Sequence, residues 1–236
     1  EPLNKAICFL FGDIDLSFKA SKAIHTKELN EIKRRLLPGD ILIKRNDFQV
    51  SNVGIPGFWT HSGIYLGSLQ QFDDYFAGIP QTKGLKPSEY VKFYHYEVYR
   101  KLVNKRHMIF EAVGEGVCVN KLEKIAKVDH FAGLRPQLSR EQTFNALMTA
   151  FGYFNYPYDY LFDFTDDTEV FCSELIYRAF GKTEAKDGIE FKTGTRNGQL
   201  FLFPNNFAEQ LCDEAHLATK NLDLVVFCTI GTDEKR

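Results

Sequence analysis

The sequence predicts an α+β fold, because it combines segments of helical periodicity, short β-rich segments bounded by Gly or Pro, and two such segments spaced as an antiparallel hairpin. The chain has 236 residues, 44% of them hydrophobic and 25% charged, a composition typical of folded globular proteins. No repeat and no Gly/Ser/Pro-rich linker divides it. We therefore expect a single domain over residues 1–236.

The first half of the chain predicts one helix and four strands. Residues 26–37 have apolar side chains at helical spacing after the capping residue Thr26, and the pair Pro38-Gly39 ends this helix. The β-rich segments are residues 40–44, 61–66, 107–113 and 116–122. Because Gly114-Glu115 joins the last two, we expect them to form a hairpin.

The second half predicts three helices and a final strand. Ser139 and Gln142 have the spacing of a capping box, and apolar residues then recur with the period of a helix up to Phe151. A short helix over residues 172–180 ends at Gly181. We expect Asn205 or Asn206 to cap a helix that reaches Ala218, and residues 222–230 to form the last strand.

The segment from Gln70 to Arg106 shows the weakest pattern. Its middle contains Gly and Pro around residues 78–87, and a Tyr-rich, charged stretch follows at residues 90–99. We interpret the segment as an insertion that covers a cleft.

Charge and composition exclude several kinds of partner. With 29 Lys and Arg against 31 Asp and Glu, the net charge is −2, so the chain lacks the basic field that binds a nucleic-acid backbone. Its longest apolar runs, residues 6–11 and 224–228, are shorter than the about 18 residues that cross a bilayer. The sequence predicts neither a nucleic-acid partner nor a transmembrane segment.

Other features bear on compartment and cofactors. The five cysteines contain no CxxC pair, and no histidine pairs with another ligand type at helical spacing, so we expect no metal and no cofactor. The chain begins at Glu1-Pro2 without methionine. This start is compatible with removal of a leader, and it favours the bacterial cell envelope or export.

Cys172 is the first candidate for chemistry. It occupies the first turn of the predicted helix 172–180, where free N–H groups and the positive end of the helix dipole favour the reactive thiolate. The alternative is core packing, because Cys172 begins an apolar stripe that continues through Leu175, Ile176 and Ala179. Periodicity alone does not decide between the two interpretations.

His61 and Glu111 are the candidate partners of the thiol. His61 opens a strand directly after a loop, so its imidazole can point into a cleft, although a structural histidine fits equally. Glu111 lies within an apolar strand, on the same side as Ile109 and Val113 by strict alternation. A carboxylate that faces inward there needs a cationic or donor partner, unless this face of the strand is solvated.

Four short motifs resemble the YiiX/YebB-like branch of the NlpC-type cysteine hydrolases, which is the circularly permuted form of the papain-like fold. The motifs are residues 37–42 (LPGDIL), 60–67 (THSGIYLG), 110–117 (FEAVGEGV), and 158–159 (YD) together with 171–175 (FCSEL). The order histidine, carboxylate, cysteine is that of the permuted branch. The resemblance covers roughly residues 36–215, and it makes residues 1–35 an N-terminal extension and residues 70–106 an unmatched insertion.

The resemblance implies a fold in which helices pack on a mostly antiparallel sheet or small barrel. It also implies Cys172 as nucleophile, His61 as general base and then acid, and Glu111 as the group that orients the imidazole. The expected substrates are peptides or acyl amides, peptidoglycan fragments among them. No oligomeric state is implied.

Tyr158 is a candidate substrate contact or second oxyanion donor, because it precedes Cys172 in a loop that Pro157 stiffens. Tyr156 and Tyr160 are alternatives, and the aromatic loop can equally pack over the next helix. The acidic residues that follow lack the spacing and glycine of a calcium loop and indicate a solvated loop; they are Asp163, Asp166, Asp167 and Glu169.

Two other functions remain open. The same trio on a similar fold acts on acyl chains, so a lipid or N-acyl hydrolase or acyltransferase is possible. The second is a non-catalytic module that holds a peptide or amino acid with Tyr-rich loops.

Overall fold

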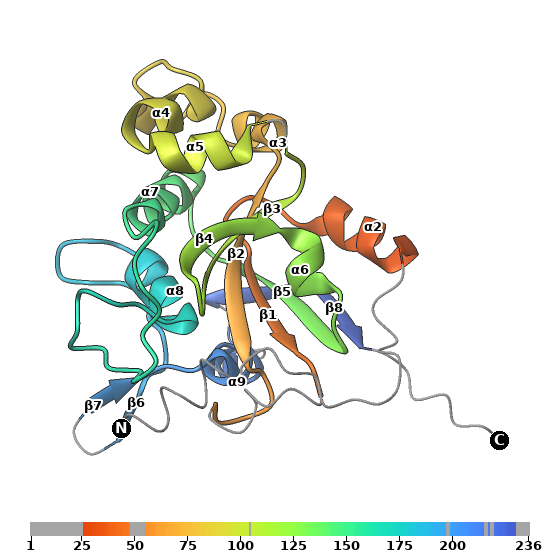
Figure 1. The fold of residues 1–236 in the computed structure, drawn as a ribbon, viewed down its shortest axis with the longest axis vertical. Helices are drawn as coiled ribbons and strands as arrows, with labels where there is room; N and C mark the ends of the chain where they lie inside the picture. The colour runs from red at the N-terminus through yellow and green to blue at the C-terminus, as the bar shows by residue number, and fades with distance from the viewer. Residues whose placement is uncertain are drawn as a thin grey trace.

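A computed structural model of the chain describes residues 26–47, 55–103, 105–196, 199–214, 217 and 220–229. Most of the predicted N-terminal extension, with Cys8 and His25, lies outside the described residues, as do Gly54, His216 and Ala218. Figure 1 shows the arrangement of the described helices around a central sheet.

The central sheet has six antiparallel strands in the order β4-β3-β2-β1-β5-β8. Within the described part of the chain β4 and β8 each pair on one side only, so the structure has an open sheet rather than the barrel alternative. The strands are β1 (Ile41–Arg45), β2 (His61–Gly67), β3 (Met108–Val113), β4 (Gly116–Lys121), β5 (His130–Pro136) and β8 (Leu222–Thr229).

Helices cover both faces of this sheet (Figure 1). They are α2 (Thr26–Arg35), α3 (Leu69–Tyr75), the 3₁₀ turn η2 (Pro80–Thr82), α4 (Pro87–Tyr94), α5 (Tyr96–Leu102), α6 (Leu122–Ala126), α7 (Arg140–Phe151), α8 (Cys172–Phe180) and α9 (Pro204–Glu214). On one face, Ile64 of β2 belongs to the same buried cluster as Ile176 of α8. On the other face, Tyr65 of β2 belongs to the cluster of Ile32 in α2 and Ile125 in α6.

The strongest helix prediction is confirmed in detail. The Ser139 hydroxyl accepts a hydrogen bond from the Gln142 N–H at 3.2 Å, and the Gln142 side-chain oxygen accepts one from the Ser139 N–H at 2.9 Å. These reciprocal bonds form the predicted capping box of α7. Helix α8 and the β3–β4 hairpin also occur where the sequence predicts them.

Several boundaries differ from the prediction by a residue or more, and two helix boundaries have a clear physical reason. Helix α2 ends at Arg35, because the Asp40 side chain accepts a hydrogen bond from the Leu37 N–H and starts the turn earlier. Helix α9 begins at Pro204, before both predicted capping residues; Asn206 lies inside it and accepts a hydrogen bond from the Phe203 N–H at 2.8 Å. Proline suits a first helical position because its φ is already helical.

Strand β5 and helix α6 were not predicted, and neither was a short hairpin of β6 (Gly194–Arg196) and β7 (Gln199–Phe201). Three-residue strands are too short to show an alternating pattern. The hairpin precedes α9, and the Ser173 hydroxyl of α8 donates a hydrogen bond to the Leu202 carbonyl at 2.6 Å. This bond ties the start of α8 to the chain that follows β7.

The segment predicted as an insertion is helical and contains α3, η2, α4 and α5. It follows Gly67 at the last residue of β2, whereas His61 is the first residue of that strand. Seven residues of strand separate the two ends by roughly 20 Å. Figure 1 shows α4 and α5 together at one end of the molecule, beside α7. The helices of this segment therefore extend from the end of β2 that lies opposite His61.

Candidate active site

His61 and Glu111 form a short, mostly buried ion pair. The His61 Nε2 atom lies 2.7 Å from Glu111 Oε2, and the side chains are 14% and 2% exposed. Glu111 therefore faces inward and has the partner that a buried carboxylate requires. The alternative of a solvated edge position does not apply, because β3 lies between β2 and β4.

The register of β2 and β3 explains why these two side chains meet. Ile64 pairs with Phe110, so Gly63 lies opposite Glu111 and His61 is its diagonal neighbour on the same face. Diagonal neighbours across antiparallel strands lie within reach of long side chains. A Cβ atom at Gly63 would lie 3.3 Å from the Glu111 Cβ atom, so the glycine leaves room for the carboxylate side chain.

Asn120 is a site residue that sequence reasoning missed. Its Nδ2 atom donates to Glu111 Oε1 at 2.8 Å and lies 3.2 Å from the Cys118 sulfur. Glu111 pairs with Cys118 in the β3–β4 hairpin, so Asn120 is again a diagonal neighbour. The predicted hairpin register was the signal that could have identified it. The two Glu111 oxygens thus have separate partners, His61 on one side and Asn120 on the other.

The loop before His61 is held from two directions. The Arg45 guanidinium donates to the Phe58 carbonyl at 2.7 Å, and the Asn205 side-chain oxygen accepts a hydrogen bond from the Phe58 N–H at 2.9 Å. Arg45 also lies over the Phe58 ring, 4.9 Å from its centroid. Contacts from β1 and α9 therefore fix the chain where it enters β2.

Cys172 is the first residue of α8 and is 2% exposed. Its thiol hydrogen-bonds with the His61 ring, and the Ser62 backbone also bonds to it. Both sequence interpretations are therefore partly correct, because Cys172 begins the buried stripe of α8 and also contacts the imidazole. The structure brings Cys172, His61 and Glu111 into one chain of contacts.

The electrostatics of this trio favour charge separation. Burial acts against a charged His61, but hydrogen bonds and negative charge from Cys172 and Glu111 outweigh it and raise the pKa of His61 to about 9. Burial acts to raise the pKa of Cys172, but the His61 hydrogen bond and charge outweigh it and lower that pKa. The pKa of Glu111 is lowered for the same reason, against its burial. Both directions favour the thiolate–imidazolium form of the pair over the neutral form.

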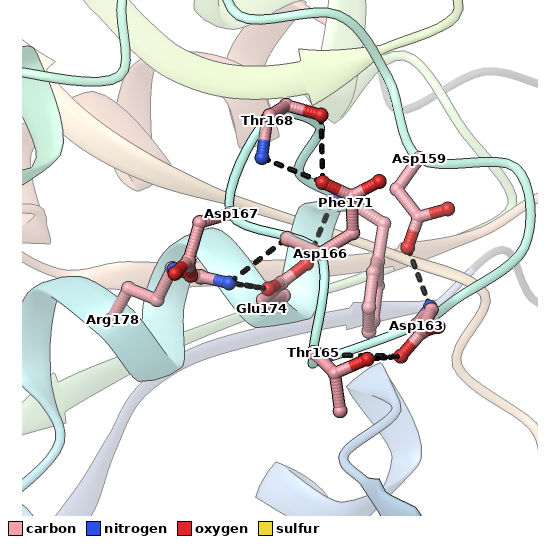
Figure 2. A network of polar contacts seen from close by, with 9 residues as sticks. All are labelled: Asp159, Asp163, Thr165, Asp166, Asp167, Thr168, Phe171, Glu174 and Arg178. Atoms are coloured by element: carbon pink, nitrogen blue, oxygen red, sulfur yellow. Dashed lines mark hydrogen bonds and ion pairs between the residues drawn. The ribbon is translucent and has the colours of Figure 1, made fainter.

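The loop that leads to Cys172 is fixed to α8 by a charged network (Figure 2). Glu174 is fully buried, and its Oε1 atom lies 2.6 Å from an Arg178 nitrogen. Arg178 also contacts the Asp167 carboxylate at 2.6 Å and donates to the Asp166 carbonyl at 3.2 Å. The Glu174–Arg178 pair has the i, i+4 spacing of helix ion pairs, which was a usable sequence signal.

The acidic residues of this loop bond mainly to the loop itself. The Asp163 carboxylate accepts hydrogen bonds from the N–H and hydroxyl of Thr165, and the Asp166 carboxylate accepts the same pair from Thr168. Buried Asp159 accepts bonds from the Leu161 and Asp163 N–H groups, the latter drawn in Figure 2. Among the described residues no group of His, Cys, Asp and Glu is arranged to hold a metal ion.

Tyr158 is half-buried and packs against the main core cluster. Its backbone forms an isolated parallel bridge with Val170, two residues before Cys172, and its ring contacts the Tyr160 ring at 5.0 Å. Tyr160 donates to the Gly114 carbonyl at 3.1 Å, so that hydroxyl has a structural partner. The part of Tyr158 in substrate binding stays a prediction.

The remaining described histidines have structural contacts. His107 bonds to the Tyr65 hydroxyl at 2.8 Å, His130 lies 2.7 Å from the Thr229 hydroxyl, and His95 packs against the Phe151 ring.

The order of elements and the trio together define a permuted papain-like cysteine hydrolase. A sequence model of one family, the permuted papain-like amidase enzymes of the YaeF/YiiX type (peptidase family C92), matches residues 35–209. The chain belongs to this family, and it is therefore a cysteine amidase or peptidase with the fold that the sequence motifs implied. Neither the curated proteins nor the solved structures contain a significant match to it.

In the described part of the chain, none of the helices combines the length and apolar character needed to cross a membrane.

Proposed function

We propose that this amidase works through an acyl-enzyme on Cys172, with His61 as general base and acid and Glu111 as the group that orients the imidazole. The observation that carries the proposal is the contact chain from the Cys172 thiol through His61 to Glu111, with the His61–Glu111 distance of 2.7 Å. The three residues are remote in sequence, and a thiol, an imidazole and a carboxylate in contact are the groups that nucleophilic acyl transfer uses, which supports the proposal.

The reaction then runs in two halves. The Cys172 thiolate attacks the amide carbon, and the His61 imidazolium gives its proton to the departing amine as the C–N bond breaks. His61 next takes a proton from water, the resulting hydroxide attacks the thioester, and the thiolate leaves with the acid product free. Glu111 stabilises the imidazolium in both halves, because its carboxylate is buried and bonded to the ring.

The oxyanion of each tetrahedral intermediate needs donors. The Cys172 N–H is one candidate, because the first N–H groups of a helix have no acceptor within the helix. Tyr158 is the proposed second donor or substrate contact, since its bridge to Val170 places its backbone beside the chain that enters α8. Tyr158→Phe is expected to lower kcat about tenfold or more if the hydroxyl donates to the oxyanion, whereas an unchanged kcat would reject that role.

Asn120 is proposed as a positioning residue. It donates to the Glu111 oxygen that His61 does not use, at 2.8 Å. The bond orients the carboxylate plane so that the second oxygen faces the ring. Asn120 does not itself touch the reacting atoms in this mechanism.

We propose peptides of the cell-wall type as the substrates, because the resemblance implied them and amide cleavage is the activity of the family. The test offers the purified chain muropeptides, N-acyl amides and acyl esters in parallel, with products identified by mass spectrometry. Release of amine from muropeptides, absent in Cys172→Ala, is the expected result. Turnover of acyl esters alone would reject the substrate proposal.

The acyl-enzyme has its own test. Acid quenching during turnover, followed by peptide mapping, should show the acyl mass on the peptide that contains Cys172. A burst of product without any adduct on that peptide would contradict the covalent step.

Alkylation separates a catalytic thiol from a binding module. Cys172 is buried and Cys212 is exposed, so absolute rates with iodoacetamide reflect access as well as ionisation. The informative quantity is each rate relative to its own value at high pH. We expect Cys172 to keep its rate at pH values well below the pKa of about 8.5 of a free thiol, unlike a cysteine in a short unstructured peptide. Parallel profiles would favour the non-catalytic module.

A further inference from the structure

Large apolar side chains are exposed on the segment of residues 83–106, which we call the α4–α5 surface. Four of them are 44% to 75% exposed: Leu85, Phe93, Tyr94 and Tyr96. Phe93 is the most exposed of the large hydrophobic residues in the described part of the chain. The exposure is not loose packing, because Val91 and Val98 of the same helices are buried beneath.

The same surface is strongly basic. Residues 83–106 contain seven Lys and Arg and two Glu, a net charge of +5, in a chain whose net charge is −2. The rest of the chain therefore carries −7. All seven basic residues are exposed; they are Lys83, Lys86, Lys92, Arg100, Lys101, Lys105 and Arg106.

Basic side chains and rings lie close together within this segment. The Lys92 ammonium lies 5.7 Å from the centroid of the Tyr99 ring, and the Phe93 and Tyr94 rings are in contact at 4.8 Å. An exposed apolar group among basic side chains is the composition of surfaces that lie at a membrane interface, where rings enter the headgroup region and Lys or Arg meet anionic lipid.

We propose that the α4–α5 surface docks on an anionic lipid surface, with Phe93 and Tyr96 at the headgroup boundary and the basic residues against lipid phosphates. A long soluble polyanion fits this surface less well. Such a polymer would extend beyond residues 83–106, and the net charge of −7 on the rest of the chain would repel it. A membrane meets only one end of the molecule. Figure 1 shows α4 and α5 at that end.

The docking position has a consequence for the amidase. The α4–α5 surface follows the last residue of β2, and His61 is its first residue. A docked molecule therefore holds the His61 end away from the lipid plane. Docking and turnover of a soluble peptide are expected to be independent, so either proposal can fail without the other.

The test is sedimentation of the full chain with vesicles made of equal parts phosphatidylcholine and phosphatidylglycerol, and with vesicles of phosphatidylcholine alone. We expect binding to the anionic vesicles, weakened by salt. The double variant Lys83→Glu with Lys86→Glu should weaken binding about tenfold or more. Phe93→Ser with Tyr96→Ser should also weaken it several-fold, because the apolar contact is lost.

Matched controls use exposed residues elsewhere. Lys121→Glu with Lys182→Glu makes the same charge change, and Phe227→Ser removes a ring that is 54% exposed on β8. Both should bind like the unmodified chain. Equal binding to neutral vesicles, equal loss in the controls, or tighter binding to soluble polyphosphate that is insensitive to Phe93→Ser would each overturn the proposal.

Discussion

The two ends of strand β2 differ in the kind of side chain that is buried or exposed near them. At the His61 end, ionisable groups are buried and each has a partner, as in the His61–Glu111 pair. At the Gly67 end, the chain continues into helices that expose Phe93 and Tyr96 beside basic residues. Burying charge and exposing rings both cost stability in an isolated chain. In our two proposals the first end serves chemistry and the second serves contact with another surface.

The largest expected effect is loss of turnover on removal of the sulfur. Cys172→Ala should lower kcat about 10⁴-fold or more, because no other group supplies the nucleophile. Thermal melting should change little, since a small buried side chain replaces another. Rate measurements with a released amine and a melting curve check this pair of outcomes. Strong destabilisation with residual activity would instead make Cys172 a packing residue.

The second largest effect is expected when the buried carboxylate of Glu111 loses its charge. Glu111→Gln keeps the shape but removes the charge that helps to raise the pKa of His61 to about 9. In the unmodified enzyme, activity should rise as the thiol ionises and fall as pH passes about 9, where His61 loses its proton. The variant should lose about 10²- to 10⁴-fold in kcat, and its upper limb should move to lower pH.

Glu115→Gln is the matched control, because Glu115 is an exposed carboxylate in the same hairpin. It should leave both limbs of the pH profile in place. An unmoved upper limb in Glu111→Gln would show that the His61–Glu111 contact does not tune the imidazole.

A smaller effect is expected at Asn120, one step further from the sulfur. Asn120→Ala removes the hydrogen bond to Glu111 Oε1 and should lower kcat about tenfold with little change in KM. Asn120→Asp should lose more, because a second carboxylate beside Glu111 opposes its charge and shifts the lower limb of the pH profile. Cys118→Ala, which removes the other neighbour of Asn120, should stay within about threefold.

The smallest effect is expected at the far end of β2. Phe93→Ser with Tyr96→Ser should change the free energy of unfolding by about 0.5 kcal/mol or less, as is usual for exposed sites. Turnover of a soluble peptide should remain within about twofold. Denaturant titration and steady-state rates measure both. A marked fall in kcat would mean that the two ends of β2 are coupled, which would contradict the expected independence of docking and turnover.

How far the sequence predicts this molecule depends on whether a feature is local. The capping box of α7 and the turn of the β3–β4 hairpin are formed by residues within a few positions of one another, and both are confirmed. The bounds of α2 and α9 were less accurate, because the Leu37 N–H bonds to Asp40, and α9 begins at Pro204 ahead of Asn206.

The site likewise contains residues that the sequence identified and one that it did not. The identities of His61, Glu111 and Cys172 followed from motif order, and the structure brings these residues together. Asn120 was missed because it lies outside the motifs; its contact with Glu111 comes from the register of β4 against β3, which the predicted turn could have supplied. The position of the helices α3 to α5 did not follow either, because no periodicity in residues 70–106 tells which end of β2 they extend.

The sequence by itself determined the elements that have a clear local signal and the chemical types at the site, since periodicity, capping and turn residues act over one or two turns of chain. Strand β5, helix α6 and the β6–β7 hairpin lay outside that reach. Tertiary structure decided which of those types meet. His61 and Glu111 lie 50 positions apart and join only through strand register. The shifted pKa values of the imidazole and thiol then follow from shared burial, which is a property of the packed molecule and of no segment alone.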